Sequence, residues 1–399
     1  MKEVVVVSAC RTPIGRFGGM LRSLTAVELG ALVIKESLRR AGVKPEQVDY
    51  VFLGQVVTAG CGQVPARQAA VKAGVPADVP AITINKVCSS GIKAIDLAAQ
   101  MIAAGRADIC VAGGMESMSN TPYGLPEMRW GARMGVPGRQ VLDLMVYDGL
   151  WCSFYNRHMA VHGSEVAKEF GITREDQDRW AYHSQMNAKQ AMEGGKLKDE
   201  IVPVEIRDPR GGVKTVEIDE QPRPETTLEA LAKLPPVFDP DGTVTAGNAP
   251  GINDGAAAVV VMSREKAAEL GIAPLWAILG YAEVSQDPKY IATVPGLSIR
   301  KLLKDTGYAL EQMKIIEINE AFAAVVLVSA KKILEMPEED LYTRVNVNGG
   351  AIAYGHPIGA TGARIAMTLA YELKRRGGGI GICGICSGAA QGDAMLIKV

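Results

Sequence analysis

The chain contains two copies of one local pattern. Residues 34–47 (IKESLRRAGVKPEQ) and residues 299–312 (IRKLLKDTGYALEQ) align without a gap. Each stretch is predicted to be an amphipathic helix that ends at a glycine, Gly42 or Gly307, and an apolar run typical of a strand follows each. A repeated helix–strand unit predicts two similar halves packed about a pseudo-twofold axis.

The likeness returns further along both copies. Residues 81–85 (AITIN) resemble residues 344–348 (RVNVN), and helices are predicted over 91–105 and 362–376. A strand-like apolar run follows each of these helices. The alternation of strands and helices predicts an α/β fold with parallel or mixed sheets.

One long segment, residues 119–245, has no counterpart in the repeat. It is rich in Gly, Met, Arg and Pro, and we expect it to form an inserted loop domain over the core. The expected N-terminal half is then residues 1–118 together with about 246–270, and the C-terminal half is residues 271–399. A chain of 399 residues exceeds the size at which single cores stop growing.

Composition excludes several classes of function. The chain is 48% hydrophobic and 22% charged, has a net charge of −1, and contains no long basic run. Nucleic acid and anionic membranes are therefore not expected partners, and no segment reaches transmembrane length. The four histidines are scattered, so no metal site is expected. Seven cysteines without the spacing of a disulfide scaffold indicate free thiols in a reducing compartment, which predicts a cytoplasmic location.

Cys88 lies at the junction between a predicted strand and a predicted helix, in the stretch NKVCSSGIKAIDLAAQ. Free backbone N–H groups and the positive end of the helix macrodipole lower the pKa of a thiol at such a junction. Cys88 is therefore predicted to be either a nucleophile or an ordinary buried cysteine in a tight turn.

The duplication connects Cys88 with a histidine. When the copies are aligned at residues 81–85 and at Gly91, the second copy has extra residues that include His356. Helix starts of two related halves should face each other near the axis. Cys88 and His356 are therefore expected to meet in space.

Two further residues follow strands of the second half. Asn319 lies in EINEAF and Cys386 lies in GICSGAAQG. Taken singly, His356 could be a structural histidine, Asn319 a turn residue, and Cys386 a small buried hydrophobe. Cys383 and Cys386 could form a redox pair only at a helix start, because residues i and i+3 of a strand point to opposite faces.

Together these segments resemble the thiolase family, and most closely its acetyl-CoA C-acetyltransferase type. The resemblance covers nearly the whole chain, and its motifs are SACRTPIGRFGG, GQVPARQAAVKAG, NKVCSSGIKAI, AGGMESMS, REDQDRWA, KDEIVPV, GTVTAGNAPGINDGAA, NEAF, NVNGGAIAYGHPIGATGAR and ICSGAAQG. It implies a duplicated α/β fold of two similar αβαβα-layered halves with an inserted loop domain. It also implies reversible Claisen condensation of two acetyl-CoA to acetoacetyl-CoA and CoA.

The resemblance assigns roles by matching positions. Cys88 should carry the acyl group, and His356 should accept its proton. Cys386 should remove the α-proton of the second acetyl-CoA. One oxyanion hole should consist of His356 and a water held by Asn319, and the other of the backbone N–H groups of Cys88 and Gly388.

Coenzyme A (CoA) should contact the inserted region and nearby loops. The matching positions are His158, Met159, Arg223, Ala246, Ala321 and Phe322. Three departures from the family pattern concern the ligand: Pro250 stands where a serine is common, Ala160 replaces a glycine, and residues 291–295 (IATVP) replace the common MGTGP. CoA thioesters are the implied substrates, with no further cofactor.

Other functions stay open at this point. The nearest is a 3-ketoacyl-CoA thiolase of broader chain length. A ketoacyl synthase generally lacks a second catalytic cysteine, so Cys386 argues against it, and a non-catalytic acyl-CoA-binding protein should have lost one of the three reactive residues. Acetyl-CoA, CoA and 3-ketoacyl-CoA are the expected partners. Residues 126–138 resemble a tetramer-forming segment, so a homotetramer is expected.

Overall fold

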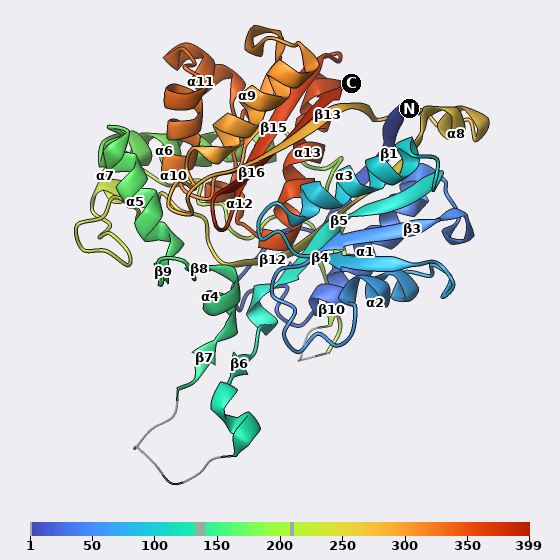
Figure 1. Ribbon diagram of the computed structural model, residues 1–399, viewed down its shortest axis with the longest axis horizontal. Coiled ribbons are helices and arrows are strands. Elements are labelled where there is room, and N and C mark those ends of the chain that lie inside the picture. The colour runs from blue at the N-terminus through green and yellow to red at the C-terminus, as the bar shows by residue number, and fades with distance from the viewer. Residues whose placement is uncertain (1, 132–133, 135–139, 208–210) are drawn as a thin grey trace.

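One large mixed sheet of ten strands runs through the molecule (Figure 1). The computed structural model describes residues 2–131, 134, 140–207 and 211–399. The strand order is β14-β15-β16-β13-β1-β12-β5-β3-β4, with short β2 beside β12. The strands are β1 (Val4–Arg11), β2 (Gly15–Arg16), β3 (Tyr50–Gly54), β4 (Ala81–Ile84), β5 (Ile109–Ser117), β12 (Asn253–Ser263), β13 (Trp276–Ser285), β14 (Ile315–Ile318), β15 (Ile380–Ser387) and β16 (Gln391–Lys398).

The sheet consists of two similar halves. In the first half β3 is parallel to β5, and β12 is antiparallel to both β5 and β1. In the second half β14 is parallel to β15, and β16 is antiparallel to both β15 and β13. The halves join where β1 pairs with β13. The counterpart of β4 is a single bridge between Ile316 and Val345. The predicted duplication is confirmed.

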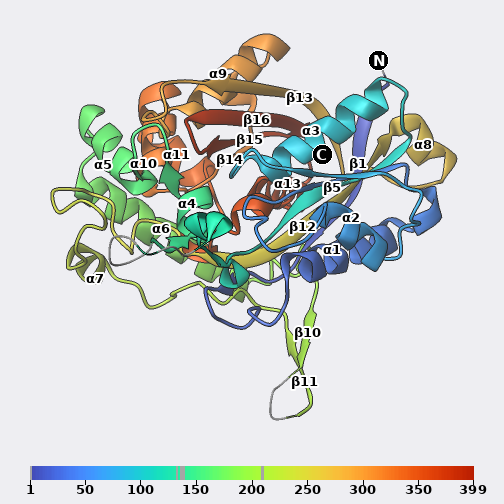
Figure 2. The same cartoon turned by 60° about the horizontal axis from the view of Figure 1, so that its bottom comes forward.

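Helices cover the outer faces of the two halves of the sheet, and two more helices lie between the halves (Figure 2). Helices α1 (Ala26–Ala41) and α2 (Pro65–Lys72) pack on the outer face of the first half, and α9 (Val294–Thr306) and α10 (Ala323–Leu327) pack on that of the second half. Helices α3 (Ser90–Ala103) and α13 (Ile358–Arg375) lie between them and share one core with strands of both halves. The layers are therefore α–β–α–β–α.

Both repeated helices end as expected. Helix α1 stops at Gly42 with φ of 66°, and α9 stops at Gly307 with φ of 74°. A left-handed residue at this position favours glycine because a Cβ would be strained. The equivalent endings show why these two stretches remain similar in sequence.

The two central helices cross through small residues. A Cβ on Gly91 would lie 2.9 Å from the backbone nitrogen of Ala363, and one on Gly362 would lie 2.5 Å from that of Ile92. This reciprocal contact brings equivalent helices of the two halves together. Helix α13 begins at Ile358, four residues before the predicted Gly362. Pro357 precedes α13, and its φ of −67° suits a helix start. The glycines within α13 are tolerated because packing against the surrounding core stabilises this buried helix.

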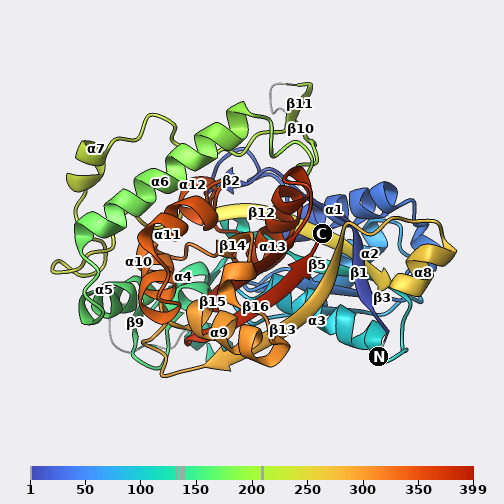
Figure 3. The ribbon, with the colours of Figure 1, turned by 90° about the horizontal axis from the view of Figure 1, so that it is seen from above.

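Residues 119–245 leave the sheet and cover one side of it. Their elements are η2 (Met118–Asn120), β6 (Tyr123–Gly124), η3 (Pro126–Trp130), β7 (Leu142–Asp143), α4 (Leu144–Gly149), β8 (Trp151–Cys152), β9 (Arg157–His158), α5 (Met159–Glu169), α6 (Arg174–Glu193), β10 (Val204–Arg207), β11 (Val213–Val216) and α7 (Leu228–Ala232). The β6–η3–β7 arm extends from the body in Figure 1, β10 and β11 project in Figure 2, and α6 lies along the second half in Figure 3.

The chain returns through β12 between β1 and β5, so a strand after the inserted segment completes the first half. The remaining elements are η1 (Pro45–Gln47), α8 (Arg264–Glu269), η4 (Leu310–Gln312), η5 (Val328–Ile333), α11 (Glu338–Arg344) and α12 (Ala351–Tyr354). Within the described ranges, no helix has the length and apolarity needed to cross a bilayer.

Candidate functional site

Cys88 lies in a tight turn two residues before the first residue of α3. Val87 adopts a left-handed conformation with φ of 45°, which is unusual for a β-branched residue. The Ser90 hydroxyl stabilises the turn, because it accepts the Lys86 N–H at 2.8 Å and donates to the Val87 carbonyl at 2.6 Å. The turn holds Cys88 buried at the helix start.

His356 has the equivalent place in the second half, two residues before the first residue of α13. Gly355 has φ of 103°, and a Cβ there would collide with the Asn253 side chain at 2.4 Å. Asn253 in turn accepts the His356 backbone N–H at 2.9 Å. Nε2 of His356 lies 3.2 Å from Sγ of Cys88, so the expected meeting of the two residues is confirmed.

A threonine on α13 fixes the tautomer of His356. The Thr361 hydroxyl donates to the Pro357 carbonyl at 3.0 Å and lies 2.8 Å from Nδ1 of His356. A hydroxyl has one hydrogen, so it must accept the Nδ1 hydrogen. Nε2 then lacks a hydrogen and faces the Cys88 thiol as a proton acceptor.

Burial makes both partners neutral. It raises the pKa of Cys88 to about 12, although the backbone N–H groups of Cys88 and Gly388 act to lower it. Burial, followed by the charge of Arg364, lowers the pKa of His356 to about 3. The prediction of a lowered pKa at Cys88 is therefore wrong for the resting protein. Loss of hydration outweighs the helix-start effect.

Cys386 is buried next to this pair near the end of β15. Burial, followed by the proximity of Cys88, raises its pKa well above the usual value. Cys383 packs in the central core, whereas Cys386 packs in the core of the second half. All seven cysteines are free. The redox-pair alternative thus lacks the helix start that it requires.

The remaining predicted polar groups are the backbone N–H groups of Cys88 and Gly388 and the side chain of Asn319. Both Cys88 and Gly388 direct their backbone N–H groups at the Cys88 sulfur. Asn319 follows β14, and its backbone N–H is bonded to the Gly384 carbonyl at 2.9 Å. Its buried side-chain carboxamide has no hydrogen-bond partner on either atom. Such a group requires a further partner to offset its lost hydration.

A cavity of about 500 Å³ leads to Cys88 and His356. The seven residues that sequence matching assigned to CoA or its path all line it, namely His158, Met159, Arg223, Ala246, Pro250, Ala321 and Phe322. Ile291 and Leu150 add apolar walls, and Arg16 and Arg223 contribute positive charge. This cavity suits an elongated ligand with an anionic group.

Sequence comparisons show what the chain is similar to. The N-terminal domain of thiolases matches residues 4–265, and the C-terminal domain of thiolases matches residues 272–399.

The chain belongs to the thiolase family.

Relatives of this thiolase match over their whole length. The acetyl-CoA acetyltransferase of Cupriavidus necator is 51% identical over 398 residues, with 100% of both chains covered. The probable acetyl-CoA acetyltransferase of Escherichia coli is 49% identical, with 100% of this chain and 99% of the relative covered. The crystal structure of the Bacillus anthracis acetyl-CoA acetyltransferase superimposes with a TM-score of 0.95 at 43% identity, covering 100% of this chain and 99% of that one.

Several residues of the thiolase site were not predicted from the sequence. Thr361 and Asn253 support His356, and Phe238 stacks on His158 with ring centroids 3.7 Å apart. Burial lowers the pKa of His158 to about 4. Thr361 could have been found, because it lies five residues after His356 in a predicted helix-start motif. Phe238 gives no comparable signal.

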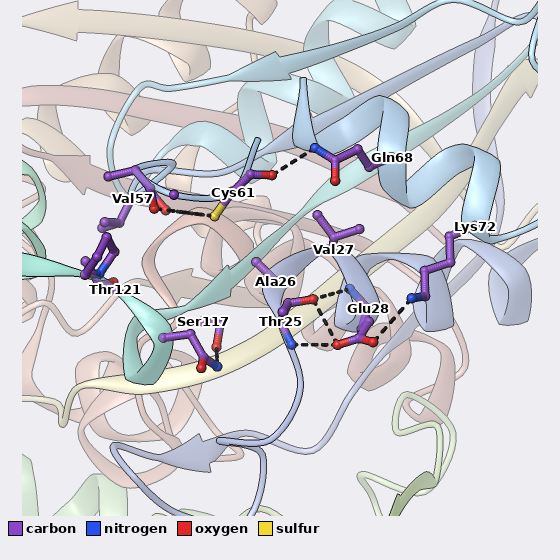
Figure 4. A pocket seen from close by; sticks show the side chains of 14 residues that line it. Thr25, Ala26, Val27, Glu28, Val57, Cys61, Gln68, Lys72, Ser117 and Thr121 are labelled. Carbon is purple, nitrogen blue, oxygen red and sulfur yellow. Dashed lines mark hydrogen bonds and ion pairs between the residues drawn. The ribbon is translucent and has the colours of Figure 1, made fainter. Parts of the chain in front are cut away.

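A second cavity, of about 390 Å³, lies away from the thiolase site (Figure 4). It lies between the start of α1, α2 and the loop that carries Cys61. Its Glu28 is bonded to Thr25 and paired with Lys72. It has a thiol but no histidine, so it lacks the nucleophile–base pair of the first cavity. Across the described part of the chain, no cluster of three or more His, Cys, Asp or Glu side chains could hold a metal ion.

The segment predicted to form a tetramer, residues 126–138, is only partly described. Residues 132–133 and 135–138 lie outside the described residues. In the described part, Trp130 and Met134 are fully or almost fully exposed.

Proposed function

We propose that this thiolase condenses two acetyl-CoA molecules to acetoacetyl-CoA and CoA, and catalyses the reverse thiolysis. One observation carries the proposal: a Cys88–His356 pair, with its acceptor nitrogen facing the thiol, lines a cavity of about 500 Å³ and has a second thiol beside it. The acetyl-CoA acetyltransferases that match the whole chain support the choice of substrate.

In the first half-reaction, Nε2 of His356 takes the proton of Cys88 as the sulfur attacks the thioester carbon of acetyl-CoA. The backbone N–H groups of Cys88 and Gly388 would bind the negative oxygen. CoA leaves with the proton from His356, and Cys88 carries the acetyl group. Because the resting pair is neutral, proton transfer accompanies the attack rather than precedes it.

In the second half-reaction, Cys386 would give its proton to Nε2 of His356, and its thiolate would then remove the α-proton of another acetyl-CoA. The Nε2–H of His356 and a water bound to Asn319 would hold the enolate oxygen, and the free carboxamide of Asn319 supports this role. The new carbon–carbon bond expels the Cys88 thiolate, which takes back a proton from His356.

CoA itself would lie along the first cavity. Arg16 and Arg223 supply positive charge for its phosphates, and the apolar walls suit its pantetheine chain. Pro250 has no N–H to donate, so the pantetheine amides must bind elsewhere. No cofactor beyond CoA thioesters enters this scheme.

The oligomeric state, the domain boundaries and the cellular location are also part of this proposal. We propose a homotetramer built as a dimer of dimers, because large apolar side chains such as Trp130 are exposed on the β6–η3–β7 arm. We also propose the domain boundaries given above, with residues 119–245 as the inserted unit, and a cytoplasmic location.

Mapping of the acyl-enzyme tests the chemistry. Acetyl-CoA labelled in its acetyl group should leave the label on the Cys88 peptide after a rapid acid quench, and Cys88→Ala should leave it nowhere. A label on Cys386 or Cys383 would reverse the proposed roles.

The second candidate is a thiolase of broader chain length, which the apolar walls at Ile291 and Leu150 favour. Thiolysis rates on 3-ketoacyl-CoA esters of increasing length decide between the two. We expect acetoacetyl-CoA to have the highest kcat/KM. An equal value for the eight-carbon ester would favour the broader enzyme.

A further inference from the structure

The two thiols of the site belong to different halves, and specific contacts join the segments that carry them. We name residues 85–90 the nucleophile turn and residues 386–393 the thiol hairpin. The Ser387 hydroxyl of the hairpin donates to the Lys86 carbonyl of the turn. The Lys86 ammonium reaches back to Asp393 of the hairpin, with Nζ 2.7 Å from Oδ1.

Packing adds a third contact between the same segments. A Cβ on Gly388 would lie 3.2 Å from Cγ2 of Val87, so the Val87 side chain lies directly over the hairpin backbone. Val87 is the strained residue that precedes Cys88, and Gly388 follows Cys386 by two residues. The turn and the hairpin therefore hold one another next to both sulfurs.

The Lys86–Asp393 ion pair is the charged contact among these three and is largely buried. The Asp393 side chain is fully buried and Lys86 is 14% exposed. Asp393 also accepts the Tyr281 hydroxyl, and its second oxygen has no partner. In the sheet, Asp393 lies opposite Ile385, the residue before Cys386. A movement of Asp393 would thus move the second thiol.

Energetics argue against a mainly stabilising role for this ion pair. Removing two charges from water costs about as much as their attraction returns, and apolar replacements of such pairs are often neutral or stabilising. The ion pair should matter more for the position of the thiols than for stability, since a displacement of about 1 Å in an active site can cost about 10²-fold in rate.

We propose that the Lys86–Asp393 pair is a positioning device that sets the separation of the Cys88 and Cys386 sulfurs. This inference rests on the proposed function. In condensation the acetyl carbon on Cys88 must meet the α-carbon that Cys386 deprotonates, so this step depends on the separation of the two sulfurs. Acetyl transfer to Cys88 needs His356 and the nearby N–H groups, and the Ser387 and Val87 contacts remain to hold these.

Two assays on Lys86→Met and Asp393→Asn separate these steps. Acetyl exchange between acetyl-CoA and isotopically labelled CoA reports the Cys88 step alone, and acetoacetyl-CoA synthesis reports both steps. We expect synthesis to fall roughly 10- to 100-fold and exchange to change less than about threefold. Lys86→Arg, which keeps the charge, should restore most of the synthesis.

Lys93→Met is the matched control. Lys93 pairs with Asp96 and with Glu283, a carboxylate that also pairs with Lys86, but it bonds to neither the nucleophile turn nor the thiol hairpin. It should leave both rates near wild type. Should the two charge variants fail to fold, Tyr281→Phe removes another hydrogen bond to Asp393, keeps the Ser387 and Val87 contacts, and should lower synthesis more than exchange.

A readout without turnover makes the outcome independent of the proposed reaction. Dibromobimane becomes fluorescent when its two arms bind two neighbouring thiols, so bridging of Cys88 and Cys386 reports their separation. The yield should fall in Lys86→Met and not in Lys93→Met. Equal losses of exchange and synthesis, or unchanged bridging, would overturn the positioning role. Absence of acetyl exchange in the wild-type protein, with bridging still dependent on Lys86, would overturn only the proposed function.

Discussion

The two halves of the molecule use the same place for different chemistry. In the first half a thiol stands two residues before α3, and in the second half an imidazole stands two residues before α13. A full strand, β4, leads to Cys88, whereas a single bridge at Val345 and the short helix α12 precede His356. The comparison teaches that the repeat supplies two facing helix starts, and local differences decide which one bears the nucleophile and which the base.

The largest effect should come from breaking the pair that joins the halves. Cys88→Ala and His356→Ala should each lower kcat for acetoacetyl-CoA synthesis on the order of 10⁴-fold or more, because the two residues act in one step. Their double variant should be no worse than the poorer single variant. Additive losses, measured by steady-state kinetics, would mean that the two helix starts act separately.

Removal of the second thiol should separate the half-reactions. Cys386→Ala should lower condensation by about 10²–10⁴-fold, the range of a general base, while Cys88 is still acetylated. Intact-protein mass spectrometry measures the acetylation, and product formation measures the condensation. Normal condensation in this variant would remove Cys386 from the mechanism. Cys383→Ala is the matched control, since that thiol lies in the central core.

In each half a hydroxyl on the helix supports the reactive residue, and removing one or the other hydroxyl should have different effects. Thr361→Val removes the acceptor for Nδ1 of His356, so kcat/KM should fall roughly 10- to 100-fold, with an altered pH profile. Ser90→Ala removes backbone contacts of the nucleophile turn and should cost about 1–3 kcal/mol of unfolding free energy. A large stability loss with an unchanged pH profile for Thr361→Val would contradict the tautomer assignment.

The buried imidazole of His356 should make the free energy of unfolding depend on pH in acid. The pKa of His356 is about 3 in the folded protein and about 6.5 when unfolded, so the unfolded chain binds more protons between these values. The stability that neutral, buried His356 contributes is fully present above pH 6.5. It is lost as pH falls toward 3, by up to about 1.4 kcal/mol per pH unit. Urea unfolding of His356→Asn should lack that part of the slope. An identical slope would mean that His356 is hydrated.

Much of this arrangement was predictable from the sequence because the duplication is visible there. The repeat at residues 34–47 and 299–312 gave the two halves, and the facing helix starts gave the Cys88–His356 contact. Local position could not give the pKa of Cys88, since its burial depends on packing between α3, α13 and the thiol hairpin. Asn253 and Lys86 were missed because their partners lie more than a hundred residues away.

The crossing of α3 and α13 at Gly91 and Gly362 also limits how this chain could be divided. The two helices share their core with strands of both halves, so neither half could complete its interior alone. A fragment ending before β13 would leave the face of α3 open to water, and the remaining fragment would expose α13. The repeat therefore marks two similar units that share one interior, so we expect them to unfold together rather than one after the other.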